Sequence, residues 1–182
     1  MFVGKDVDMK CDIVVMKQIL FFVTMFSLIT SFLNADSLQI GSAAPEVSVA
    51  DHEGNTLDLG AALREGTTVV FFYPKAMTPG CTQQACSLRD SWEILKQRGV
   101  KIYGVSSDTS KAQAKFREKY QLPFTLIADT DQVVSKSFGK NRWSRQAYIF
   151  KDDKLVWRDL NASTANQADD ILAALDEIEK SN

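Results

Sequence analysis

Residues 67–86 read Thr67-Thr-Val-Val-Phe-Phe-Tyr-Pro-Lys-Ala-Met-Thr-Pro-Gly-Cys-Thr-Gln-Gln-Ala-Cys86, and they combine a strand pattern with the start of a helix. It opens with a continuous β-branched and aromatic run between Gly66 and Pro74, which is typical of a strand buried on both faces of a central sheet. From Pro79 the apolar residues recur every three or four positions as far as Gly99, which predicts a helix. Reactive groups gather at the carboxyl end of such a strand.

The rest of the chain continues the alternation of strands and helices. A turn at 51–54 lies between two short alternating segments, which predicts an N-terminal β-hairpin from 46–50 and 55–59. The later elements are predicted as strand 100–105, helix 110–120, strand 124–128, short helix 132–138, hairpin 146–158 and helix 166–180. This order predicts an α/β three-layer sandwich around a mixed sheet, with right-handed crossovers in its parallel part.

Composition limits the function classes that are open to the chain. Its 182 residues suffice for one domain, and 21 Lys and Arg against 23 Asp and Glu give a net charge of −2. Since no basic run is interleaved with aromatics, nucleic acid is a poor first hypothesis for a partner. Three cysteines and a single histidine exclude most zinc sites and most histidine-dependent nucleophiles. We expect no metal and no cofactor, and we expect His52 to be solvated in a turn.

The N-terminal segment differs in character from the rest. Residues 18–33 are uncharged and mostly apolar, and their length fits an export signal better than a spanning helix. We interpret residues 1–35 as an export signal that is removed, with Met16 as the better start, and residues 36–182 as a single domain. The mature protein would then be periplasmic or otherwise extracytoplasmic. The alternative is a membrane tether formed by the uncleaved segment.

Cys81 carries the chemistry that the sequence indicates. Thr78 followed by Pro79 is typical of a helix start, with the Thr78 hydroxyl as the N-cap and proline at the first helical position. Cys81 is then the third helical residue, where unpaired backbone N–H groups and the helix dipole favour the thiolate. A cysteine in this position becomes a nucleophile without a histidine base.

Cys86 follows Cys81 by five residues, which restricts how the two can bond. In an intact helix the Cα atoms of such a pair lie roughly 8–9 Å apart. A disulfide rarely tolerates more than about 7 Å. The spacing therefore argues against a permanent bridge and favours a switchable one that forms when the segment unwinds.

The segment Pro74-Lys-Ala-Met-Thr-Pro-Gly-Cys81 resembles the peroxiredoxin signature, and Cys86 matches the resolving position of the PrxQ or bacterioferritin comigratory protein subfamily. The resemblance runs from Gly41 to the last helix. It implies a thioredoxin-like fold of the peroxiredoxin type and a thiol-dependent peroxidase acting on hydrogen peroxide and organic hydroperoxides. Cys81 would become a sulfenic acid, and Cys86 would condense with it to a Cys81–Cys86 disulfide. Thioredoxin or a similar donor would reduce that disulfide.

The resemblance also implies roles for residues around the peroxidatic cysteine. Thr78 matches the residue whose hydroxyl holds the peroxide and the sulfur, and Pro74 matches the one that shields the thiolate. Arg145 resembles the arginine that stabilises the thiolate and the charge developing on the peroxide, and Gln84 falls where a side chain supports that arginine. Between Gly139 and Arg145 only Lys-Asn-Arg-Trp-Ser intervenes, a shorter loop than in many relatives. The subfamily further implies a monomer.

Two hypotheses from other classes stay open. A thiol switch or holdase of the same fold would use the disulfide to alter its binding to a client protein. A membrane-tethered thiol oxidoreductase would retain residues 18–33. Peroxide-dependent oxidation of the thiols distinguishes the peroxidase from the first, and the N-terminus of the mature protein distinguishes it from the second.

Overall fold

Seven strands and the helices that join them make up the described part of the chain, residues 37–140 and 143–180 of a computed structural model. The strands are β1 (Ser48–Asp51), β2 (Thr56–Asp58), β3 (Thr67–Phe72), β4 (Lys101–Ser106), β5 (Thr125–Ala128), β6 (Gln146–Lys151) and β7 (Lys154–Asp159). The helices are α2 (Leu59–Leu63), α3 (Pro79–Asp90), α4 (Trp92–Gln97), α5 (Ser110–Tyr120), α6 (Val133–Ser137) and α7 (Gln167–Lys180).

The export signal predicted for residues 1–35 lies outside the described residues, as do its proposed start at Met16 and the tether alternative. From Ser37 onward the chain forms one compact unit. Within that described unit, no helix combines the length and the apolar character that crossing a bilayer requires.

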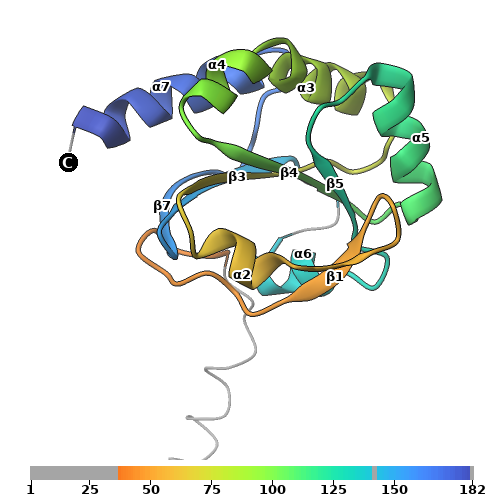
Figure 1. Ribbon diagram of the computed structural model, residues 1–182, viewed down its shortest axis with the longest axis horizontal. Coiled ribbons are helices and arrows are strands. Elements are labelled where there is room, and N and C mark those ends of the chain that lie inside the picture. Colours follow the sequence, from red (N-terminus) through yellow and green to blue (C-terminus); the bar gives the residue numbers. More distant parts are fainter. Residues whose placement is uncertain (1–36, 141–142, 181–182) are drawn as a thin grey trace, which may run out of the picture. The chain divides into compact units, whose positions relative to one another are not determined.

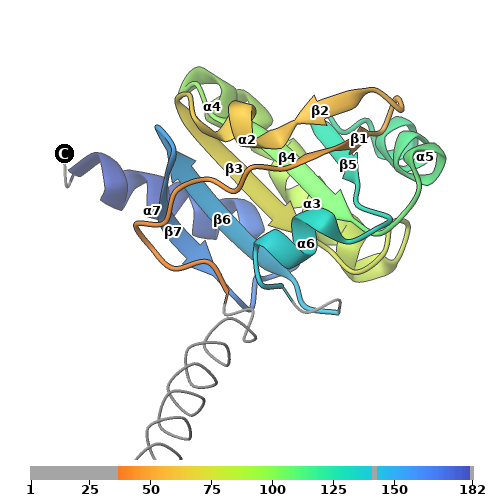
Figure 2. The ribbon, with the colours of Figure 1, turned by 90° about the horizontal axis from the view of Figure 1, so that it is seen from below.

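The sheet is mixed, as predicted, and its strand order is β2-β1-β5-β4-β3-β6-β7 (Figure 2). Strands β3, β4 and β5 are parallel, whereas β6 lies antiparallel beside β3 on the other side. Every residue of β3 after Thr67 is buried, because β3 has a strand on each side and helices on each face. The β-branched and aromatic run therefore forms the inner strand that it predicts.

Helices cover both faces of the sheet, which confirms the three-layer prediction (Figure 1). One face carries α3, α4, α5 and α7, and the other carries the short helices α2 and α6. Alternate residues of β3 serve the two layers: Val69 and Phe71 belong to the cluster under α3 and α7, while Val70 and Phe72 belong to the cluster under α2 and α6. This period of two is what a strand with two buried faces requires.

The helices of the structure differ from the prediction in two places. The helix expected from Pro79 to near Gly99 is interrupted at Ser91, whose φ of −98° and ψ of 8° end α3 and begin α4. Helix α2 was not predicted, because its few residues, Leu59–Leu63, carry too little periodicity to indicate a helix. It begins at a capping carboxylate, since Asp58 accepts the N–H of Ala61.

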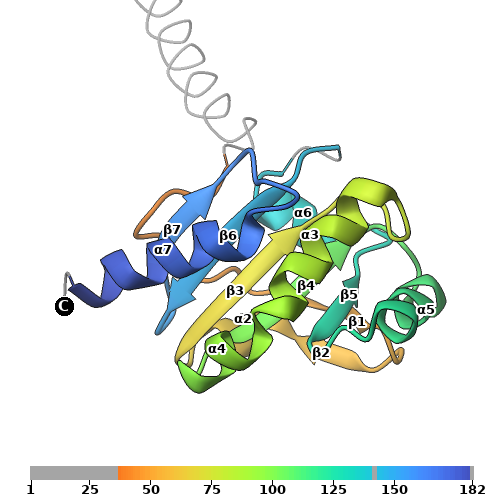
Figure 3. The same ribbon diagram turned by 90° about the horizontal axis from the view of Figure 1, so that it is seen from above.

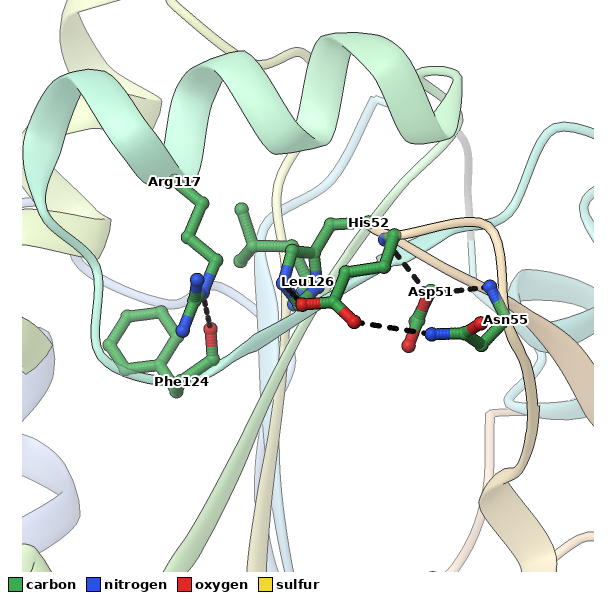
Figure 4. Close-up of polar contacts among 7 residues, drawn as sticks. Asp51, His52, Asn55, Arg117, Phe124 and Leu126 are labelled. Carbon is green, nitrogen blue, oxygen red and sulfur yellow. Dashed lines mark hydrogen bonds and ion pairs between the residues drawn. The ribbon is translucent and has the colours of Figure 1, made fainter.

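The solvated position expected for His52 is wrong, since the residue is only 9% exposed. Asp51, the last residue of β1, pairs with Ile127 of β5. Beyond that point the His52 imidazole accepts the next available N–H of β5, from Leu126 to Nδ1 over 3.4 Å (Figure 4). His52 lies in a turn but is buried, because its ring accepts a hydrogen bond from the neighbouring strand β5.

Candidate active site

The Cys81 thiol lies in the first turn of α3, just beyond the carboxyl end of β3. Pro79 is the first helical residue, and the first helical hydrogen bond runs from Thr82 N–H to Thr78 C=O over 2.9 Å. The N–H groups of Gly80 and Cys81 therefore precede the helical ladder, which gives this end its partial positive charge. Cys81 is 1% exposed. The predicted position of the thiol, third in the helix, is confirmed.

Thr78 occupies the N-cap position with extended backbone, but its hydroxyl does not cap the helix. The hydroxyl instead donates to the carbonyl oxygen of Lys75 over 2.9 Å. That carbonyl comes within reach because Met77 takes a φ of 65°, which curls the loop back on itself. The capping prediction is thus wrong for the side chain, and the oxygen of Thr78 keeps lone pairs that can accept a hydrogen bond from a ligand.

Asp108 anchors the loop between β3 and α3. This role of Asp108 was not predicted from the sequence. Its Oδ2 accepts the N–H of Ala76 and the hydroxyl of Ser106, each over 2.7 Å. Because Ser106 ends β4, the parallel neighbour of β3, the carboxylate ties the loop to the next strand end. A polar Ser-Ser-Asp run directly after a predicted strand is the sequence signal that could have indicated this role.

Arg145 approaches the thiol from the start of β6, the strand that lies on the side of β3 away from β4. Strand β6 runs antiparallel to β3 with Gln146 opposite Phe72, so the start of β6 lies at the same edge as the end of β3. Arg145 directly precedes Gln146, and its Nη2 lies 3.7 Å from the Cys81 sulfur. A fixed guanidinium at this distance stabilises a thiolate and any negative charge that develops beside it.

Gly80 makes room for that arginine and is a second residue that the sequence analysis missed. A Cβ at this position would lie 2.8 Å from Nη2 of Arg145 and 3.4 Å from the methyl group of Thr164. Glycine is disfavoured within helices, so its presence in the first turn of α3 was an available signal of a close approach.

Gln84 lies one turn after Cys81 and is fully buried, but its amide nitrogen donates to Oε1 of Gln167 over 2.8 Å. Its own Oε1 and the Nε of Arg145 are both buried without a hydrogen-bond partner. Support of Arg145 by Gln84 therefore stays a prediction. Gln167, the first residue of α7, is a buried neighbour of the site that the sequence did not indicate.

A buried polar chain underlies the site. The Tyr73 hydroxyl donates to Oε1 of Gln113 over 2.5 Å, and the Gln113 amide nitrogen donates to Ser106 Oγ and Ile127 O. Burial raises the pKa of Tyr73 far above its usual range. The phenol therefore stays protonated, which excludes it as a general base and assigns it to holding the strand ends together.

Cys86 lies on the same helix, half-buried, and both thiols are free. Helix α3 is continuous across the two cysteines, in agreement with the argument from their spacing. Burial raises the pKa of the Cys86 thiol, whereas the charge of Arg89 opposes that change. Burial thus disfavours the thiolate of Cys86 in this conformation, and Cys86 needs a change of backbone to reach Cys81.

Pro74 directly follows β3 and lines a narrow polar pocket with Tyr73, Ser106 and Lys140. Its shielding of the thiolate stays a prediction. Across the described residues, no three His, Cys, Asp or Glu side chains converge as metal ligands would. The arrangement as a whole can activate a thiol nucleophile and stabilise negative charge beside it.

Comparison with known proteins gives consistent results at three levels. The AhpC/TSA family matches residues 40–158. The peroxiredoxin Bcp of Escherichia coli K12 is 41% identical over 114 residues, which are 63% of this chain and 71% of that protein. The crystal structure of peroxidoxin BcpB from Mycobacterium tuberculosis is similar with a TM-score of 0.71 and 30% identity, over 78% of this chain and 98% of that one.

A second solved structure is the bacterioferritin comigratory protein of Xanthomonas campestris, described for its alkyl peroxide reduction activity. It is similar with a TM-score of 0.69 and 26% identity, over 78% of this chain and 98% of that one.

Proposed function

The chain belongs to the AhpC/TSA family as a peroxiredoxin of the Bcp/PrxQ type and is a thiol-dependent peroxidase, and we propose that Cys81 is its peroxidatic residue. One observation carries this assignment: the Cys81 sulfur lies in the first turn of α3 with the Arg145 guanidinium 3.7 Å away. Each feature favours the thiolate, and together they replace the histidine base that the site lacks.

In the first step the thiolate attacks the terminal oxygen of a hydroperoxide. The S–O bond forms as the O–O bond breaks, so that Cys81 becomes a sulfenic acid and the leaving oxygen departs as alkoxide or hydroxide, which takes up a proton. Arg145 stabilises the negative charge on that oxygen. The Thr78 hydroxyl, which donates to Lys75, accepts a hydrogen bond from the peroxide and orients it.

In the second step the Cys86 thiol condenses with the sulfenic acid, which forms the Cys81–Cys86 disulfide and releases water. Because the cysteines are five residues apart on an intact helix, the first turns of α3 must unwind for this bond to form. A thioredoxin-type dithiol then reduces the disulfide. We propose hydrogen peroxide and organic hydroperoxides as substrates and antioxidant defence as the role.

Consumption of peroxide with a thioredoxin system as electron donor tests the assignment. The Cys81→Ser variant is expected to lose consumption of cumene hydroperoxide and hydrogen peroxide. The Cys86→Ser variant is expected to complete one turnover and then stop, with a sulfenic acid that a dimedone probe traps on Cys81. If the wild type consumes no peroxide while its thiols oxidise by another route, the thiol-switch hypothesis replaces the peroxidase.

The cellular location and the oligomeric state of the protein are part of the same proposal. We propose that residues 1–35 direct export and are removed, which places the peroxidase outside the cytoplasm, and that the mature protein is a monomer. The intact mass of the protein purified from its own cells tests the first point, with Asp36 expected as the N-terminus. Retention of residues 18–33 would instead favour a tether. Sedimentation velocity of the mature protein tests the second point.

A further inference from the structure

Two hydrogen bonds join the helix that carries both cysteines to the last helix of the chain, which lies beside it (Figure 3). The amide nitrogen of Gln84 donates to Oε1 of Gln167 over 2.8 Å, and both side chains are 0% exposed. One turn further on, the N–H of Ala168 donates to the hydroxyl of Ser87 over 3.0 Å. We refer to these two bonds as the α3–α7 latch.

The latch lies on the segment that has to move. Gln84 is between Cys81 and Cys86, and Ser87 directly follows Cys86. The end of α3 has a separate attachment, since Arg89 donates to the carbonyl oxygen of Tyr120 over 2.9 Å. Unwinding the turns between the cysteines therefore breaks the bond to Gln167 and strains the bond to Ser87, while the far end of α3 can stay in place.

The latch opposes this unwinding because Gln167 has no substitute partner. Its Nε2 is buried and unpartnered, and within the described residues its Oε1 accepts only from Gln84. When α3 unwinds and Gln84 moves away, the fully buried amide of Gln167 has no protein hydrogen bond until water enters. The reverse also holds: a side chain at 167 that cannot accept would leave the Gln84 amide unpaired while α3 is wound.

From these contacts we propose that Gln167 is a positioning residue of the resolving step, holding Gln84 so that α3 stays wound and so setting how long the Cys81 sulfenic acid lasts before Cys86 reaches it. This inference rests on the proposed peroxidase function. It concerns a competition between two reactions of one intermediate. Condensation with the Cys86 thiol gives the disulfide and water, whereas a second hydroperoxide oxidises the sulfenic acid to sulfinic acid and is reduced to an alcohol or water.

The test compares the Gln167→Met variant with the wild type by rapid quenching and mass spectrometry of Cys81 after addition of cumene hydroperoxide. Disulfide formation is expected to be about 2- to 10-fold faster, the range that corresponds to one buried neutral hydrogen bond. Sulfinic acid per turnover at high peroxide should fall by a similar factor. The rate of sulfenic acid formation should not change, which a general loss of structure would not reproduce.

Gln83→Met is the matched control, because Gln83 lies on the same helix between the cysteines but is exposed. It should resolve at the wild-type rate. Ser87→Ala removes the second bond of the latch and is expected to act in the same direction as Gln167→Met, with a smaller effect. This variant also tests the latch if Gln167→Met does not fold.

Two outcomes would overturn the inference. Wild-type resolution rates in both Gln167→Met and Ser87→Ala would show that the latch does not limit unwinding. Slower sulfenic acid formation in Gln167→Met, with unchanged resolution, would show that Gln167 acts on the peroxide step through Arg145 instead. Failure of the peroxidase function is distinguishable from both, because the wild type would then form no sulfenic acid with peroxide.

Discussion

The ring cluster under α6 and the contact between α3 and α7, on the opposite face of the sheet, are packed differently. Under α6, four large rings, those of Phe72, Phe138, Tyr148 and Phe150, meet edge to face with centroids 5.0–5.8 Å apart. Under α3 and α7 the contact includes small residues, among them Ala85 and Ala168, together with the buried Gln84–Gln167 amide pair.

The difference concerns the α3–α7 contact and not the whole face, since Phe71, Tyr73, Phe116 and Phe124 also pack ring against ring on the side of α3 and α5. Aromatic side chains bury large areas and interlock in defined geometries, which stabilises the face opposite the site. Small side chains bury less area, and a hydrogen bond between amides can be exchanged for bonds to water. We therefore expect variants of the ring cluster under α6 to change stability, and variants around the thiol and in the α3–α7 contact to change rates.

The largest effect is expected from Phe138→Ala, which removes a ring that contacts three others. The free energy of unfolding should fall by about 3–5 kcal/mol, because a large cavity remains in a fully buried site. Urea denaturation measures this change. The folded variant should oxidise at the wild-type rate, and Val133→Ala, at an exposed position of α6, serves as the control. A slower peroxide step at unchanged stability would contradict the expectation that the ring cluster under α6 contributes to stability and not to the rate.

Arg145→Ala is expected to give the largest effect on rate. Loss of the guanidinium 3.7 Å from the sulfur should lower the second-order rate constant for peroxide by about 10²–10³-fold, as for the loss of one charge-stabilising donor. Stopped-flow oxidation measures the rate, and urea denaturation should show little change. Arg98→Ala removes a surface ion pair with Asp176 and should leave the rate unchanged. A large loss of stability in Arg145→Ala would contradict the expectation that the residues around the thiol set rates and not stability.

Gly80→Ala should separate rate from stability most directly. The new Cβ would lie 2.8 Å from Nη2 of Arg145, so the guanidinium has to shift from the position that it holds beside the thiol. We expect the peroxide rate constant to fall by about 10- to 100-fold, as small misplacements of a catalytic group do. The free energy of unfolding should change by less than the roughly 0.5–1 kcal/mol that separates glycine from alanine in a helix interior, because Gly80 lies in the first turn of α3.

Stopped-flow kinetics and urea denaturation on the same preparation measure both effects of Gly80→Ala. Gln83→Ala, at an exposed position of the same helix, is the control. An unchanged rate would show that Arg145 needs no space at Gly80.

The smallest effect is expected from Lys140, the charged group on the aromatic face. Its Nζ lies 5.4 Å from the centre of the Phe72 ring, and burial lowers the pKa of Lys140 to about 8. The unfolded amine keeps its proton up to about pH 10.5, whereas the folded amine loses it near pH 8. The unfolded state therefore binds more protons between these values, and stability rises with pH across that window.

The wild type should gain stability relative to Lys140→Met between pH 8 and 10.5, because only the wild type carries the amine that loses its proton on folding there. Urea denaturation at several pH values measures the difference between the two proteins. Lys115→Met, at an exposed position of α5, is the control. A difference that stays constant with pH would show that the buried amine does not titrate with folding.

Local sequence patterns predicted much of this molecule. The run before Pro74 predicted the inner strand because a strand with two covered faces requires continuous apolar residues. Thr78 and Pro79 located the start of α3, and Cys81 followed as its third residue. These features depend on residues that are neighbours in the chain, so a pattern can reveal them.

The tertiary structure decided what depends on distant partners. Arg145 meets Cys81 because β6 pairs with β3, and Gln84 meets Gln167 because α7 packs on α3. The burial of His52 has the same kind of cause, since its acceptor role follows from the pairing of β1 with β5. Sequence alone predicted which residue carries the reactive sulfur and determined where its helix begins. Strand register and helix packing decided what surrounds it, because these contacts join residues far apart in the chain.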